Sequence, residues 1–109
     1  MTRQEPIPNH GRTRGSIVTV SSLAGLNASS GMSAYCASKH ALVGLAKCDA
    51  LDHGPRGVRV NVICPGMIDT DLFRATSPVD APERLAAITP VRRLGTPEDV
   101  AALAAFLCS

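Results

Sequence analysis

Tyr35 and Lys39 are the residues of this sequence whose types and spacing most clearly suggest chemistry. Tyr35 is the only tyrosine of the 109-residue chain, and Lys39 follows four positions later in the stretch SAYCASKHALVGL. Residues at positions i and i+4 share one face of a helix, so both side chains can point into the same crevice. A phenol has a pKa of about 10 and is a poor base at neutral pH, but an ammonium group held nearby favours the phenolate. The pair therefore predicts a tyrosine that acts as a general acid or base.

A predicted helix from Ser33 to about Asp52 carries this pair. Small and apolar residues recur along it at steps of three or four, and a His-Gly-Pro sequence ends the pattern. Two runs rich in β-branched residues, Gly15–Ser22 and Val58–Cys64, predict short strands buried on both faces. The alternation of strands and helices indicates a parallel α/β sheet with its ligand crevice at the carboxyl ends of the strands. Ser22 thus ends a strand where a hydroxyl can hydrogen-bond a substrate oxygen.

The remaining segments carry fewer signals. Residues 1–14 are polar and contain prolines, so a lead-in of loop or frayed helix is predicted there. Met67–Leu94 is irregular, with one short helix predicted at Asp80–Ala87. Thr96 is followed by a proline and two acidic residues, which is the pattern of a helix start. A last helix is therefore predicted after Thr96.

Composition excludes several classes of function. The net charge is +2, and the basic residues are spread along the chain, which argues against a nucleic-acid partner. No apolar run approaches the roughly 20 residues that span a bilayer, and the first residues lack the apolar centre of a secretory signal. The four cysteines form no CxxC pair, so neither a metal site nor a disulfide framework is predicted. A cytoplasmic protein without a membrane partner is expected.

Three stretches together resemble the short-chain dehydrogenase/reductase family: GSIVTVSSLAG, YCASKHALVGL and RVNVICPGMIDTD. The family signature is a YxxxK pair with a serine thirteen residues before the tyrosine, and Ser22 holds that place relative to Tyr35. A downstream NxxxPGxxxT pattern begins at Asn61. The resemblance covers about Gly15 to Ser109, so it extends over nearly the whole chain.

The resemblance implies a fold, a reaction and roles for individual residues. The fold would be a Rossmann fold, a doubly wound parallel sheet, and the reaction a hydride transfer between NAD or NADP and a small-molecule carbonyl or alcohol. Tyr35 would be the acid/base, Lys39 would assist it and hold the nicotinamide ribose, and Ser22 would steady the substrate oxygen. Residues implied to hold the rest of the nicotinamide half are Pro65, Gly66, Ile68 and Thr70.

Two serine/threonine positions have competing interpretations. Ser21, next to Ser22, is expected to pack or to cap rather than to react. Thr70 could be an ordinary helix cap, although its distance from Pro65 favours the role in cofactor binding. The resemblance also implies that Asp71 to about Ala87 belongs to a variable substrate loop.

The glycine-rich turn of a dinucleotide site is missing from this sequence. No GxGxxG or GxxxGxG pattern occurs, although the pyrophosphate of a dinucleotide needs such a turn. Residues 15–109 are therefore expected to be the C-terminal part of one Rossmann-type domain, without its N-terminal nucleotide-binding half and its last strand. The chain would be part of a full-length oxidoreductase, or a short non-catalytic product that associates with a full-length partner. By the resemblance, the Ser33–Asp52 helix would pack in a homo-oligomer.

Overall fold

Two short parallel strands form the sheet of this chain. The computed structural model describes residues 14–109, so almost all of the predicted lead-in lies outside the described residues. β1 (Gly15–Val20) pairs with β2 (Val58–Ile63) in register, from Gly15 opposite Val58 to Val20 opposite Ile63. Most residues of both strands are β-branched, which favours an extended backbone. Because the strands are parallel, both end at the same edge of the sheet, where ligands bind in sheets of this kind.

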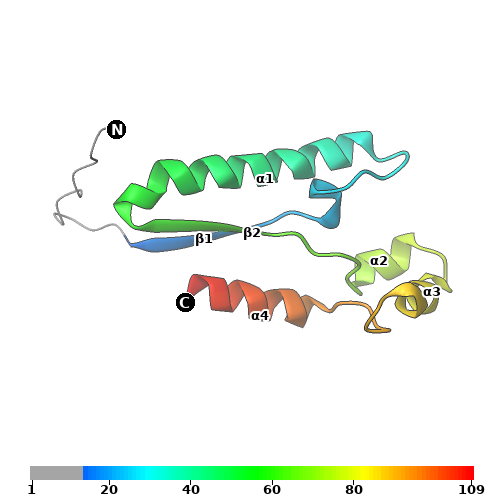
Figure 1. The fold of residues 1–109 in the computed structure, drawn as a ribbon. Coiled ribbons are helices and arrows are strands. Elements are labelled where there is room, and N and C mark those ends of the chain that lie inside the picture. The colour runs from blue at the N-terminus through cyan, green and yellow to red at the C-terminus, as the bar shows by residue number, and fades with distance from the viewer. Residues whose placement is uncertain (1–13) are drawn as a thin grey trace.

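Two long helices cover opposite faces of this sheet (Figure 1). α1 (Ser33–His53) packs mainly on β2, and α4 (Pro97–Cys108) packs mainly on β1. α1 begins at the predicted residue and ends one residue after the predicted end. A 3₁₀ turn, η2 (Gly54–Arg56), follows it, and Gly57 then leads into β2 with φ 80°, a conformation that glycine adopts readily. The predicted order of strand, helix, strand and helix is confirmed.

The predicted helix start at Thr96 is confirmed, and the structure shows that it is a complete capping box. The Thr96 hydroxyl accepts a hydrogen bond from the Asp99 backbone N–H at 3.2 Å, and the Asp99 carboxylate accepts one from the Thr96 N–H at 2.9 Å. Pro97 occupies the first turn, where its missing N–H costs nothing. These contacts satisfy two backbone donors that a helix start otherwise leaves unpaired.

The segment between β2 and α4 is more regular than predicted. It contains two helices, α2 (Asp71–Thr76) and α3 (Ala81–Ile88), of which only α3 is predicted, to within a residue at each end. Both lie beyond the carboxyl ends of the strands (Figure 1). A parallel bridge between Ile68 and Gly95 joins the start of this segment to its end. The bridge holds the residues that follow β2 in place beside the sheet edge.

The prediction that both strands are buried on both faces is wrong for this chain. Among the strand residues only Ile63 is buried, whereas the Ile17 and Val20 side chains are 50% and 46% exposed. Each strand has one neighbour in the described sheet, so α1 and α4 shield only part of its faces. The strands also end earlier than predicted, before Ser22 and Cys64, because Ser22 caps a 3₁₀ turn instead of continuing β1.

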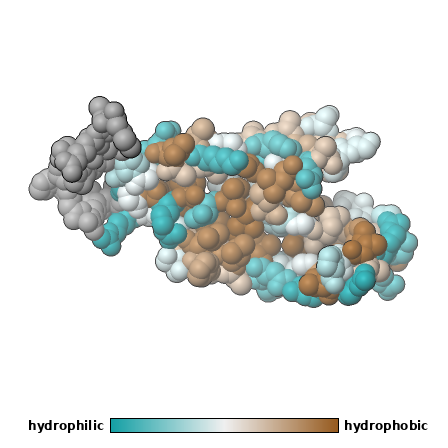
Figure 2. Space-filling model, in the orientation of Figure 1, coloured by the Kyte–Doolittle hydropathy of each residue, from teal (hydrophilic) through white to brown (hydrophobic). Residues whose placement is uncertain are grey.

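Some of the exposed apolar residues form a patch. Figure 2 shows apolar surface over the middle of the visible face, between α1 and α4. On α4, the Leu103 and Phe106 side chains are 44% and 73% exposed. Within residues 14–109, no helix is both long enough and apolar enough to cross a membrane. The chain therefore presents an apolar surface of the kind that usually marks an interface.

Candidate active site

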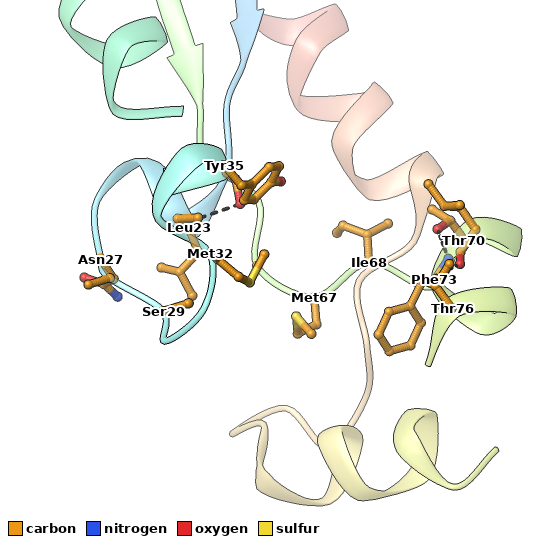
Figure 3. A pocket seen from close by; sticks show the side chains of 15 residues that line it. Leu23, Asn27, Ser29, Met32, Tyr35, Met67, Ile68, Thr70, Phe73 and Thr76 are labelled. Carbon is orange, nitrogen blue, oxygen red and sulfur yellow. Dashed lines mark hydrogen bonds between the residues drawn. The ribbon is translucent and has the colours of Figure 1, made fainter. Parts of the chain in front are cut away.

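A cavity of about 670 Å³ lies at the carboxyl edge of the sheet. This volume is within the usual range of small-molecule sites. Its walls come from the segment after β1, the start of α1, the loop after β2, and α2. In Figure 3, Leu23, Met32 and Tyr35 lie on one side, Thr70, Phe73 and Thr76 lie on the other, and Met67 and Ile68 lie between them. Five predicted site residues line it: Ser22, Tyr35, Gly66, Ile68 and Thr70.

Tyr35 and Lys39 form a pair on the first turns of α1. The Tyr35 side chain is 42% exposed and lines the cavity. The Lys39 Nζ lies over the Tyr35 ring, 5.7 Å from its centroid, which is within the range of a cation–π contact. Lys39 is not among the residues that line the cavity. The helical spacing thus brings the two side chains together, with the cation on the ring face.

Ser22 lies at the edge of the cavity with its hydroxyl oriented by the backbone. It is the N-cap of the 3₁₀ turn η1 (Leu23–Gly25), and its Oγ accepts a hydrogen bond from the Ala24 N–H at 3.1 Å. Accepting this bond uses a lone pair and leaves the hydroxyl proton free to be donated. Ser22 can therefore act as a donor toward a ligand oxygen in the cavity.

Ser21 fixes the distance between this turn and α1. Its side chain is 5% exposed, and its Oγ donates a hydrogen bond to the Lys39 carbonyl oxygen at 2.8 Å. The predicted packing role of Ser21 is confirmed. Gly25 allows this close approach, because a Cβ there would lie 2.5 Å from the Ser21 Oγ. No residue pattern marks Gly25 as a site residue; the one signal for it is a glycine between two short segments that must pack together.

The loop after β2 is joined to the turn after β1. The Pro65 carbonyl oxygen accepts a hydrogen bond from the Leu23 N–H at 2.8 Å, although Pro65 itself does not line the cavity. In the Ile68–Gly95 bridge, the Gly95 N–H donates to the Met67 carbonyl at 3.0 Å and the Asp69 N–H donates to the Gly95 carbonyl at 2.8 Å. This pattern uses the peptide groups on either side of Ile68. The N–H and C=O of Ile68 itself therefore point away from Gly95.

Thr70 both caps a helix and lines the cavity. Its Oγ1 accepts a hydrogen bond from the Phe73 N–H at 3.0 Å and so begins α2. The capping interpretation of Thr70 is confirmed. The contact also explains why α2 forms in a segment with little periodicity, since an N-cap hydroxyl stabilises a helix start by about 1 kcal/mol. Accepting this bond leaves the hydroxyl proton of Thr70 free for a ligand.

No charged side chain lines this cavity among residues 14–109. Arg74 follows the lining residue Phe73 but is bound to Asp69, with Nε–Oδ1 and Nη2–Oδ2 distances of 2.6 and 2.7 Å. The hydrogen bonds from Arg74 hold the pKa of the Asp69 carboxyl below its usual value. The ion pair thus keeps both groups charged, and the two hydrogen bonds hold the Arg74 guanidinium on the Asp69 carboxylate.

The whole chain, residues 1–109, matches the protein family described as Enoyl-(Acyl carrier protein) reductase. It is 42% identical over 108 residues to the short-chain dehydrogenase srdC of Neurospora crassa, covering 96% of this chain and 39% of that protein. Other curated relatives are covered to a similar extent, between 36% and 45% of their length. The chain thus spans less than half of the relatives that it matches.

Solved structures of related proteins share the fold. The chain superimposes on the aldohexose dehydrogenase of Thermoplasma acidophilum with a TM-score of 0.80 and 38% identity, covering 90% of this chain and 42% of that one. It also matches ElxO, solved with NADP bound, with a TM-score of 0.77 and 32% identity, over 87% of this chain and 39% of that one. The two strands and their helices therefore correspond to part of a doubly wound Rossmann domain, as predicted.

Proposed function

This chain belongs to the short-chain dehydrogenase/reductase family, and we propose that its cavity is the catalytic part of an NAD(P)-dependent oxidoreductase. The observation that carries the proposal is that Ser22 and Tyr35 line one cavity while the Lys39 Nζ lies over the Tyr35 ring. Ser22 lies in the turn after β1, whereas Tyr35 and Lys39 lie on α1. The hydrogen bond from the buried Ser21 hydroxyl to the Lys39 carbonyl oxygen joins these two segments. The reaction is the interconversion of a carbonyl and an alcohol on a small molecule.

The proposed chemistry at the substrate oxygen uses these side chains. A bound nicotinamide would supply, or accept, the hydride at the substrate carbon. The Tyr35 hydroxyl donates the proton to the oxygen during reduction and accepts it during oxidation. The Lys39 Nζ lies over the Tyr35 ring, 5.7 Å from its centroid, and so places a positive charge beside the residue that carries the proton. The Ser22 proton is hydrogen-bonded to the same oxygen and stabilises the charge that develops there.

The residues around the cavity fit the nicotinamide half of such a cofactor. A carboxamide needs one donor and one acceptor, and the N–H and C=O of Ile68 point away from the Gly95 bridge. The Thr70 hydroxyl lines the same wall and has a proton to donate. We assign the ribose hydroxyls to Tyr35 and Lys39. Pro65 and Gly66 belong to the loop after β2, which would hold the nicotinamide and the adjoining phosphates.

The helix that carries Tyr35 and Lys39 also has a surface that suits an assembly. Ala37, Ala41, Gly44 and Cys48 are exposed along α1, so a second helix could approach closely. A homo-oligomer that packs through the Ser33–Asp52 helix is therefore part of the proposal. The even charge distribution favours a protein with no nucleic-acid partner, and a cytoplasmic location is part of the proposal.

A kinetic assay tests the proposed function. The natural gene product is mixed with NADH or NADPH and a panel of ketones and aldehydes, and cofactor oxidation is followed by absorbance. Carbonyl-dependent oxidation is expected, and Ser22→Ala lowers kcat by about 10²-fold, as removal of one such donor does elsewhere. Ser38→Ala removes a hydroxyl from the same region outside the cavity and is the matched control. A folded protein that oxidises neither cofactor with any carbonyl contradicts the proposal and favours a role in association.

A further inference from the structure

The residues that line the cavity also indicate which kind of substrate it can bind. Large apolar side chains come from all the segments that enclose it, namely Leu23, Met32, Met67, Ile68, Leu72 and Phe73. The polar members of the lining are neutral hydroxyl and amide groups. We propose that the site takes an uncharged carbonyl compound with a bulky apolar substituent, in preference to one that carries a carboxylate or phosphate. This inference rests on the proposed function and concerns the same cavity.

The exclusion of anions follows from the charges near the cavity. An anionic substrate would lose hydration on entry and would need a cation in return. The cation nearest in sequence to the α2 wall is Arg74, whose guanidinium is bound twice to the Asp69 carboxylate. Lys39 lies over the Tyr35 ring and does not line the cavity. No cationic side chain on the described walls is available to pair with a substrate carboxylate.

The preference for an apolar group follows from the exposure of the walls. Without a ligand, the Met32, Met67 and Leu72 side chains are 43%, 49% and 73% exposed. An apolar substituent would cover them, and burial of apolar surface contributes about 25 cal/mol per Å². Met32 lies on one side of the cavity and Met67 lies between the two sides (Figure 3), and methionine adapts its shape to irregular partners. Substituents of several shapes are therefore accepted, provided that they are apolar.

Matched pairs of compounds test this preference in the natural gene product. Ethyl acetoacetate is compared with acetoacetate, and methyl phenylpyruvate with phenylpyruvate, because each pair shares its ketone and differs in charge. The expected kcat/KM is at least about tenfold higher for the ester of each pair. Equal or higher values for the acids overturn the inference even though they support the oxidoreductase. Binding of the same four compounds is measured by ligand-observed NMR, so that the preference is decided even if no compound is turned over.

A new charge on the wall provides the second test. Met32→Lys and Leu72→Lys each place a cation on a different, exposed part of the lining. Each is expected to lower the ester-to-acid ratio of kcat/KM roughly tenfold. Val79→Lys adds the same charge at a fully exposed position outside the cavity and leaves the ratio unchanged. A ratio that stays constant in both cavity variants, or changes as much in Val79→Lys, overturns the inference.

Discussion

The Ser21 hydroxyl is hydrogen-bonded to the backbone carbonyl of Lys39 at 2.8 Å, although the two residues are 18 positions apart. This contact fastens the carboxyl end of β1 to the second turn of α1. Ser22 follows directly on one side, and Lys39 with its partner Tyr35 lies on the other. The separation of the proposed catalytic side chains is therefore set by a buried contact beside them.

Gly25→Ala is expected to disturb this contact. The new Cβ would lie 2.5 Å from the Ser21 Oγ and 2.9 Å from the Lys39 carbonyl oxygen, so the turn must move away from α1. Overpacking of this kind costs about 1–3 kcal/mol in the free energy of unfolding, and kcat should fall because Ser22 moves with the turn. Urea unfolding and steady-state kinetics measure the two effects.

Gly54→Ala is the matched control for that variant. Gly54 directly follows α1 with helical backbone angles, φ -53° and ψ -44°, and a Cβ there would meet nothing within 4 Å. Alanine is the better helix former by up to about 1 kcal/mol, so the control should be as stable as the natural protein or more stable. Loss of stability in both variants, or in neither, contradicts the proposed role of Gly25.

The contrast between these glycines shows what the sequence can and cannot predict. The Tyr35–Lys39 pair is predictable because i, i+4 spacing has one consequence on a helix. The Thr96 cap is predictable because its chemistry is local. The need for glycine at position 25 depends on how closely η1 approaches α1, which is a tertiary distance and leaves no periodic pattern.

Two further errors have similar causes. α2 is missed because six residues are too few to show a helical period, although the Thr70 cap is a usable signal. Burial of the strands is overestimated because β-branched runs indicate strands that can be buried, whereas actual burial depends on which elements cover them. Ile17 and Val20 remain half exposed here for that reason.

Lys39→Arg is expected to impair the site although it keeps the charge. A guanidinium is planar, wide and delocalised, so even when it stacks on the Tyr35 ring it does not replace the compact point charge of the ammonium. We expect kcat/KM to fall roughly tenfold or more, with weaker cofactor binding. Lys47→Arg, at an exposed position of the same helix, is the control. Unchanged cofactor affinity and rate in Lys39→Arg would show that the pair does not act as proposed.

Acid should weaken the start of α4. Hydrogen bonds from Arg93 and then from the Thr96 backbone lower the pKa of Asp99 to about 2, from an ordinary value of 3.8. A carboxyl whose pKa is lower in the folded state stabilises the fold above the unfolded value, and this contribution is lost as the pH falls toward the folded value. The stability advantage over Asp99→Asn should therefore shrink between about pH 4 and pH 2.

The pH dependence is measured by urea unfolding of both proteins across that window. Glu98→Gln is the control, because it removes a neighbouring carboxylate that takes no part in the capping box. This variant keeps Asp99, so its free energy of unfolding should still fall between about pH 4 and pH 2 as that of the natural protein does. If the difference in free energy of unfolding between the natural protein and Asp99→Asn does not change with pH, the role assigned to this carboxylate is contradicted.

Residues 1–109 on their own are expected to self-associate. Ile17 and Phe106 are 50% and 73% exposed, and an apolar surface of this kind is unfavourable in water. Light scattering should give a mass above that of one chain, and Ile17→Thr combined with Phe106→Gln should lower it. Val79→Thr changes an apolar side chain that is fully exposed elsewhere and should have no effect. A monomer that binds NADH or NADPH at micromolar concentration would contradict this expectation.

The proton transfer assigned to Tyr35 is the central claim, and Tyr35→Phe tests it most directly. The substitution keeps the ring under the Lys39 ammonium and removes only the hydroxyl in the cavity. The decisive measurement is the single-turnover rate of cofactor oxidation in the natural gene product and in this variant, with thermal unfolding to show that both are folded. The account predicts a rate lower by about 10²–10⁴-fold. A folded Tyr35→Phe variant that reacts at nearly the natural rate would contradict it.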